Sequence, residues 1–250
     1  MPTENTFHHS LKRAKAAIAK REPPPRDKRF IGLELVARLV AMAQREGEHA
    51  FAMLYLVSYV FLLRVPSEGL PIVVGTNGDA DRELALGVHS CFSFVGGDIV
   101  LKLARRKNKP HGWTGRATCW CSKGGAHKAC CPVHELGMTV ARQVGSSPFA
   151  HISPGLALAT LRRHLTALDV EHALTYRLHD FRRGHARDIA ASGGTLYDIL
   201  VAGGWSGPAF MTYMNIQELE RDNRITAHER DQVLEAQLDH SDSEAEPEGE

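Results

Sequence analysis

The feature that most constrains the fold is the apolar run at residues 50–63, AFAMLYLVSYVFLL. The run contains Ser58 and ends directly at Arg64. A helix that crosses a bilayer needs about 20 consecutive apolar residues, so this run is too short to span a membrane. It therefore predicts a helix buried in the core of a globular domain, and we expect no membrane partner.

Shorter patterns predict the elements around this helix. Leu35, Leu39 and Met42 recur at helical spacing, and Ser153 and Thr195 are side chains that commonly cap a helix N-terminus. The predicted helices span residues 33–45, 153–168, 179–192, 195–202, 210–215 and 216–238, and the predicted strands span 71–74, 83–88 and 98–103. This order predicts an α+β fold, mainly helical, with a small antiparallel β-sheet.

The near-neutral net charge of +1 conceals an uneven distribution. Residues 218–250 hold 12 acids and 3 bases, which leaves residues 1–217 with 27 bases and 17 acids, a net charge of +10. A basic body attracts phosphates, so nucleic acid is a possible partner, although the same charge also serves solubility.

Composition divides the chain into four parts. Residues 1–29 form a basic segment interrupted by Pro23–Pro25, which predicts a stiff linker. Residues 30–217 are expected to form the folded domain and residues 218–238 a C-terminal helix, and the acidic residues 239–250 have the composition of a disordered tail.

Cysteine usage favours a reduced, intracellular protein. Four of the five cysteines lie within residues 119–131, and no apolar segment of a secretory signal follows the N-terminal charges. Within the insertion 116–136, the best zinc-ligand set is Cys119, Cys121, Cys131 and His134. Because the C-x-C and C-C-x-x-H spacings differ from the usual C-x₂-C pairs, a metal-free loop is an equal alternative. Cys91 has an apolar context and is expected in the core.

The segment 178–215 carries the motif with the most chemistry. His179 and Arg182 lie three residues apart on a predicted helix, so both leave from one face. Gly204-Trp205 follows the next helix, and Tyr213 comes eight residues after Trp205. Together with the earlier Leu63-Arg64-x-x-x-Glu68 step, these residues resemble the catalytic domain of tyrosine recombinases, also called phage integrases.

This resemblance implies an enzyme that cleaves and rejoins DNA without a metal or nucleotide cofactor. Tyr213 would be the nucleophile that forms a 3′-phosphotyrosyl intermediate, and Arg64 and Arg182 would bind the phosphate. His179, with the unshifted pKa of an ordinary histidine, would accept a proton or hold the phosphate, and Trp205 would donate its N–H. Lys107 best matches the family's hairpin general acid, with Lys102 and Lys109 as competitors. Further DNA contacts are expected from Arg105, Arg106, Lys109 and Arg183.

The resemblance also implies partners and a location. Relatives act on double-stranded DNA as homotetramers that exchange a C-terminal helix, a role that residues 216–238 would take. The cysteine pattern is similar to that of fungal, transposon-borne members, which implies DNA integration or recombination in the nucleus.

Two departures from the family pattern leave other functions open. The loop between Trp205 and Tyr213 is one residue shorter than in most relatives, and only residues 1–29 precede the domain where relatives carry a second DNA-gripping domain. A DNA-binding protein that no longer cleaves, or a relaxation enzyme similar to type IB topoisomerases, is therefore an alternative. Singly, each motif residue also has a structural explanation, such as packing for Trp205 and helix capping for His179.

Overall fold

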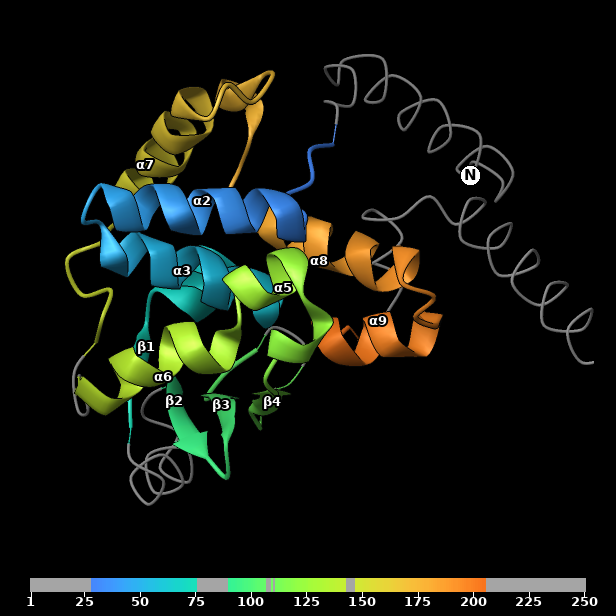
Figure 1. Cartoon of the computed structure of the whole chain (residues 1–250). Coiled ribbons are helices and arrows are strands. Elements are labelled where there is room, and N and C mark those ends of the chain that lie inside the picture. Colours follow the sequence, from blue (N-terminus) through green and yellow to red (C-terminus); the bar gives the residue numbers. More distant parts are fainter. Residues whose placement is uncertain (1–27, 76–89, 107–108, 110, 143–146, 206–250) are drawn as a thin grey trace, which may run out of the picture.

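The computed structural model describes residues 28–75, 90–106, 109, 111–142 and 147–205. The helices of these ranges pack together above one small sheet, which lies at the lower edge of the view (Figure 1). They are α2 (Leu33–Arg45), α3 (His49–Val60), α5 (Gly125–Ala129), α6 (Pro132–Arg142), α7 (Pro154–Ala167), α8 (Asp180–Ala191) and α9 (Leu196–Gly203), with short helical turns η1 (Val65–Gly69), η2 (Cys121–Lys123) and η3 (Ala173–Thr175). The α+β class predicted from the sequence is confirmed.

Helix α3 is the centre of the core. Every residue from Phe51 to Val60 is buried, which confirms the prediction of a core helix from the apolar run. Helix α2 packs along it, and α8 crosses the pair near their ends (Figure 1). In the described ranges, no helix has the length and apolar character needed to cross a membrane.

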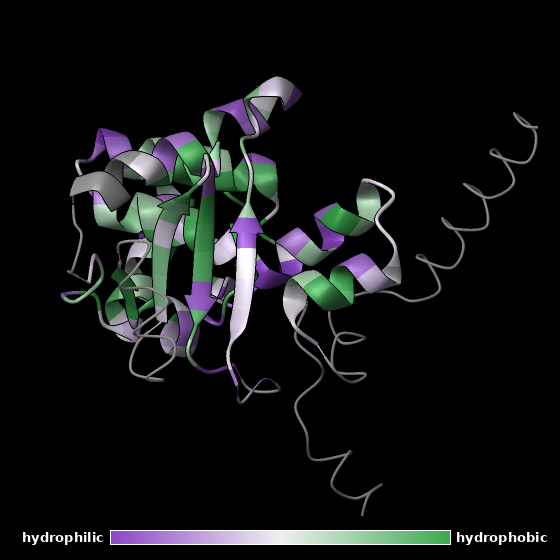
Figure 2. Ribbon diagram, turned by 90° about the horizontal axis from the view of Figure 1, so that it is seen from below, coloured by the Kyte–Doolittle hydropathy of each residue, from purple (hydrophilic) through white to green (hydrophobic). Residues whose placement is uncertain are grey.

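The sheet contains four strands in the order β1 (Ile72–Val74), β2 (Ser90–Val95), β3 (Asp98–Leu103) and β4 (Trp113–Ala117). The pairs β2–β3 and β3–β4 are antiparallel, but β1 runs parallel to β2. The prediction of an antiparallel sheet was therefore wrong for this edge, and the sheet is mixed. In Figure 2, β3 is largely apolar and β4 beside it is nearly neutral in hydropathy, which explains why sequence reasoning missed β4.

Local sequence signals located the helix ends well. The Ser153 hydroxyl accepts a hydrogen bond from the Leu156 amide at 3.1 Å, which confirms the predicted cap of α7. The Thr195 hydroxyl accepts one from the Asp198 amide at 3.2 Å, and the Asp198 carboxylate in turn accepts from the Thr195 amide. This reciprocal pair is a capping box, so α9 begins where the sequence predicted.

Helix α8 is held close to the chain segment that precedes α2. The Ile31 amide donates to the Asp180 carbonyl at 3.0 Å, and the Asp188 carboxylate accepts from the Leu33 amide and from the Tyr59 hydroxyl. Gly184 permits this approach, because a Cβ there would lie 1.9 Å from the Ile31 carbonyl oxygen. These contacts fix α8, which carries the His-x-x-Arg motif, against α2 and α3.

Candidate active site and metal centre

Arg64 and Glu68 are brought together by the turn that follows α3. Leu62 has φ of 49°, a left-handed conformation that ends the helix, and η1 then folds Glu68 back below Arg64. The Glu68 carboxylate accepts from the Arg64 amide and from its Nη1, both at 3.0 Å. Glu68 is only 3% exposed, so it is a buried structural partner of Arg64, as expected from the sequence.

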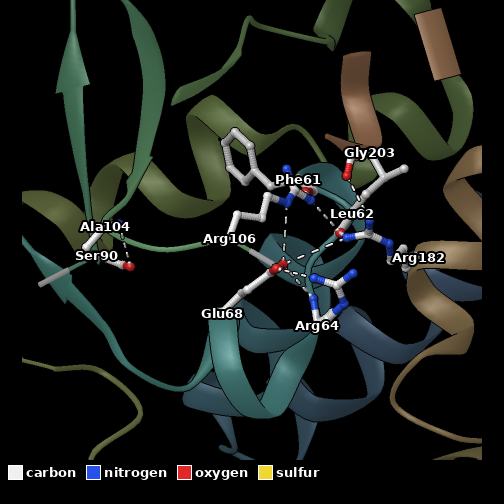
Figure 3. A network of polar contacts seen from close by, with 9 residues as sticks. All are labelled: Phe61, Leu62, Arg64, Glu68, Ser90, Ala104, Arg106, Arg182 and Gly203. Atoms are coloured by element: carbon white, nitrogen blue, oxygen red, sulfur yellow. Dashed lines mark hydrogen bonds and ion pairs between the residues drawn. The ribbon is translucent and has the colours of Figure 1, made fainter. Parts of the chain in front are cut away.

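Two further arginines reach the same carboxylate (Figure 3). The Arg106 Nε lies 3.7 Å from Glu68 Oε2, and the Arg182 Nη1 lies 3.8 Å from the same oxygen. We call Arg64, Arg106, Arg182 and Glu68 the arginine cluster. Three guanidinium groups around one carboxylate carry a net charge of +2, which suits a site for an anion.

Arg182 is deeply buried in this cluster. Its side chain is 1% exposed and donates from Nη1 to the Leu62 carbonyl at 2.5 Å and from Nη2 to the Gly203 carbonyl at 2.7 Å. Its guanidinium carbon also lies 4.3 Å from the centre of the Trp205 ring. In this arrangement, the two terminal nitrogens expected to bind a phosphate bind backbone carbonyls.

Arg106 is a member of the cluster that sequence reasoning placed elsewhere. We expected a DNA contact, but Arg106 is 4% exposed, and its guanidinium lies over the Trp113 ring and donates to the Leu62 carbonyl at 3.0 Å. Burial lowers the pKa of Arg106 to about 10, although Glu68 opposes the shift. Its Nη1 makes no hydrogen bond within the described ranges. As placed, Arg106 contributes charge to the cluster rather than a surface contact.

His179 lies at the N-cap position of α8, next to the cluster, and is partly buried. Burial is the main cause that lowers its pKa to about 4, and the positive charges of Arg182, Arg183 and Arg64 act in the same direction. The expectation of an unshifted pKa was therefore wrong, and the imidazole is neutral at neutral pH.

Trp205 is 6% exposed and packs with Leu62, Ala186 and Ile199 in a small apolar cluster between α8 and α9. Its ring face covers the Arg182 guanidinium, a cation–π contact that fixes the arginine. The packing role considered from the sequence is therefore present, and it joins Trp205 to the arginine cluster.

The remaining predicted site residues are scattered or lie outside the described ranges. Lys107 and Tyr213 are among the latter. Arg105 and Lys109 are exposed beside Arg106, and Lys102 is partly exposed on β3. Arg183 is partly exposed and donates to Asp180 at 2.7 Å. Cys91 is fully buried, as expected from the sequence, and His185 on α8 stacks on the Tyr59 ring.

The four predicted metal ligands converge between the end of β4 and the first turn of α6. The Nδ1 of His134 lies 3.2 Å from Cys121 Sγ, 3.3 Å from Cys131 Sγ and 3.9 Å from Cys119 Sγ, and the Cys119 and Cys131 sulfurs are 3.6 Å apart. All four donor atoms lie within 4.8 Å of one another. Ligands about 2.0–2.3 Å from a tetrahedral zinc are separated by about 3.5–3.8 Å, so the set fits such an ion.

The environment of this set favours a thiolate at Cys131 but not at Cys121, where burial and the neighbouring Cys119 and Cys131 thiols raise the pKa to about 11. Burial raises the pKa of the Cys131 thiol, but hydrogen bonds from His134 and from the Trp120 amide outweigh it and lower the pKa to about 6. The fifth nearby cysteine, Cys130, is fully buried in the main core and is not part of the set. A Cys₃His group of this kind could hold a metal, and the set matches the one predicted from the sequence.

A second group of acidic and histidine side chains has a simpler explanation. Glu46, Glu48 and His164 lie close together beside α7. The Arg163 guanidinium forms ion pairs with both carboxylates, and the Tyr55 hydroxyl contacts His164 Nδ1 at 3.0 Å. Because Arg163 and His164 already pair with both carboxylates, this group is best described as an ion-pair network that joins α7 to the segment between α2 and α3.

Comparison with known proteins identifies no relative: no protein-family model matches the chain, and no curated protein matches it significantly. The recombinase resemblance therefore depends on the motif residues of the sequence alone.

Proposed function

We propose that this chain cleaves and rejoins DNA through a 3′-phosphotyrosyl intermediate, as a tyrosine recombinase or integrase with the fold of that family's catalytic domain. The observation that carries the proposal is the arginine cluster. Arg64 and Arg182, which are 118 positions apart, share the carboxylate of Glu68, and His179 lies beside them. Arg64, His179 and Arg182 all belong to the recombinase motif. A net charge of +2 is suited to the negative charge of the transition state of phosphoryl transfer.

The proposed reaction needs no metal or nucleotide. The Tyr213 oxygen attacks the phosphorus, so that a tyrosyl–phosphate bond forms and the bond to the 5′-oxygen breaks. The Tyr213 proton passes to a base, and Lys107 protonates the leaving 5′-oxygen. A 5′-hydroxyl of another strand then reverses these steps and releases the tyrosine. Energy is conserved in the phosphodiester, which explains why a cofactor is unnecessary.

His179 is suited to this reaction only when a phosphate is bound. Its low pKa keeps it neutral in the free protein. An adjacent phosphate anion raises the pKa of a histidine, so substrate binding would make His179 a better base and a better hydrogen-bond donor. The neighbouring arginines limit this change, because their charge has the opposite effect.

A structural zinc ion bound by Cys119, Cys121, Cys131 and His134 is part of the same proposal. The ion would cross-link the loop after β4 to the start of α6, and it would take no part in catalysis. Trp113 on β4 covers Arg106, so a fixed loop would also steady one wall of the arginine cluster. Double-stranded DNA as substrate, a tetramer on DNA and a nuclear location complete the proposal.

The test is a covalent adduct with nicked suicide substrates. The chain is incubated with a library of nicked duplexes, denatured and analysed for a slowly migrating protein–DNA band. We expect an adduct that disappears in Tyr213→Phe and Arg64→Gln but remains in Tyr197→Phe, because Tyr197 is an exposed tyrosine on α9. An adduct that survives Tyr213→Phe would refute the proposed nucleophile.

The burial of Arg182 favours a second function, namely DNA binding without cleavage. Its guanidinium would have to leave the Leu62 and Gly203 carbonyls in order to bind a phosphate. A protein in which this exchange does not occur would bind DNA with a steep salt dependence and form no adduct on any substrate.

A further inference from the structure

A second arginine-rich site lies beside the first turn of α8, separate from the arginine cluster. It is a pocket of about 390 Å³ between α7, η3 and α8, within the size range of small-ligand sites. Its polar lining comes from four separate segments of the chain and consists of Arg29, Arg162, Thr175, Arg177, Asp180 and Arg183. We call it the α8 pocket.

The charge of the α8 pocket is unbalanced. Four arginines line it against the single carboxylate of Asp180, which leaves a net charge of +3. Asp180 is only 1% exposed, and its oxygens already accept from Arg183 Nη1 and from the Arg177 amide, both at 2.7 Å. The acid therefore organises the floor of the pocket and does not neutralise it.

The arginines at the rim retain donors for a ligand. Arg29 donates from Nε to the Thr175 hydroxyl at 3.2 Å, and Arg162 donates from Nε to the Tyr176 carbonyl at 3.1 Å. Their terminal Nη groups form no hydrogen bond with any residue that the structure describes, and the same holds for the side chain of Arg177. Two anchored guanidinium groups with open Nη donors are well suited to the oxygens of a phosphate.

The α8 pocket and the arginine cluster are adjacent sites. Arg182 and Arg183 are consecutive on α8, and Arg182 reaches Glu68 while Arg183 lines the pocket. His179 lies close to both, since each of these arginines lowers its pKa. A DNA strand that placed one phosphate at the arginine cluster would bring its neighbouring phosphates to this side of α8.

We propose that the α8 pocket binds a phosphate group. The group is either a backbone phosphate of DNA, a source that rests on the proposed function, or the phosphate of a free small molecule. In either case the pocket is a binding site distinct from the arginine cluster, and Arg29, Arg162 and Arg177 supply the open donors that bind the anion.

The experiment compares the full chain with an Arg29→Gln/Arg177→Gln double variant. Arg45→Gln is the matched control, because Arg45 is an exposed arginine at the far end of α2. One arm measures duplex DNA binding by fluorescence anisotropy across a series of salt concentrations. The other arm measures inorganic phosphate binding by calorimetry, and thermal melting confirms that each variant is folded.

For a DNA phosphate, we expect the double variant to bind DNA about tenfold more weakly, the loss typical of a charge-assisted hydrogen bond. Its slope of log affinity against log salt should also fall by about one for each lost contact. Loss of inorganic phosphate binding with unchanged DNA binding would support the pocket and assign it to a free phosphate. Equal behaviour of the double variant and Arg45→Gln in both arms would overturn the proposal.

The adduct assay separates this proposal from the proposed function. For a DNA phosphate, the double variant should need more DNA than the unmodified chain to reach half of its maximal adduct, whereas the maximal yield reports on the arginine cluster. If no protein forms an adduct, the proposed cleavage fails, while the two binding arms still decide whether the α8 pocket binds phosphate.

Discussion

Replacement of Glu68 by glutamine tests whether one carboxylate holds the arginine cluster together. The three guanidinium contacts, at 3.0, 3.7 and 3.8 Å, each correspond to a gross attraction of about 4–6 kcal/mol at an effective dielectric constant of about 20. Desolvation of the buried ions offsets much of this attraction. What remains after the change is a set of positive charges in the protein interior without a counter-ion.

Breaking a buried ion pair from one side costs about 3–5 kcal/mol of unfolding free energy. The introduced amide can still accept the hydrogen bond from the Arg64 amide, so we expect the Glu68→Gln variant to lose about 3 kcal/mol. For a domain of this size, that loss lowers Tm by roughly 6–12 °C. The assay is thermal and urea unfolding followed by circular dichroism.

Two controls make the result specific. Glu171→Gln removes a carboxylate whose side chain is 87% exposed, so its Tm should equal that of the unmodified chain. Because buried charges are poorly screened, the Glu68→Gln difference should persist at about 0.5 M salt. A Tm within 1 °C of the unmodified chain, or a difference that vanishes with salt, would show that Glu68 does not hold these arginines.

Three further changes test other parts of the structure. Gly184→Ala would place a Cβ against the Ile31 carbonyl and should cost about 1–3 kcal/mol in urea unfolding, whereas Gly155→Ala on α7 has space and should not destabilise. A strong zinc chelator should lower Tm, and added zinc, but not magnesium, should restore it. The Cys131→Ser variant should melt at the Tm of the chelated protein. A Tm that the chelator does not change would argue against the metal centre. Because the folded-state pKa of His179 is below its ordinary value, protonation favours the unfolded chain, and stability should fall as pH drops from about 6.5 to 4. The His179→Gln variant should lose less stability over this range. An identical pH profile for the variant and the unmodified chain would contradict the lowered pKa of His179.

Sequence reasoning succeeded where structure is decided locally. Ser153 and Thr195 cap their helices because a side-chain oxygen needs only an amide two or three residues away. The buried helix followed from an apolar run that has no polar face. The zinc-ligand set also followed from residues close in sequence, and the structure brings the same four donor atoms together.

Sequence reasoning failed where contacts between distant residues determine burial, strand pairing or a pKa. On β3, every second residue from Ile99 to Leu103 is buried. Because the strand ends at Leu103, this alternation does not extend to Arg106 and does not predict its burial. The parallel pairing of β1 with β2 has no local signal either. The lowered pKa of His179 depends on burial and on arginines that only the fold brings near.

Leu62 explains why the arginine cluster and the packing of α8 and α9 form one unit. A leucine with φ of 49° costs about 1–3 kcal/mol of strain, so other contacts must stabilise it. Its side chain is buried with Trp205, and its carbonyl accepts hydrogen bonds from both Arg106 and Arg182. A movement of Arg182 toward a phosphate would therefore weaken the contacts that hold this backbone conformation.

The exposure of the three arginines suggests the order in which a phosphate would contact them. Arg64 has 26% of its side chain exposed, whereas Arg106 and Arg182 have 1% each. An incoming phosphate would meet Arg64 first and would compete with Glu68 for its guanidinium. As the Arg64–Glu68 pair loosens, Arg64 would become free to bind the phosphate, while the Glu68 carboxylate stays beside the two buried arginines. In the proposed function, the Glu68 carboxylate would therefore compete with the phosphate for Arg64, while its contacts with Arg106 and Arg182 stabilise the fold.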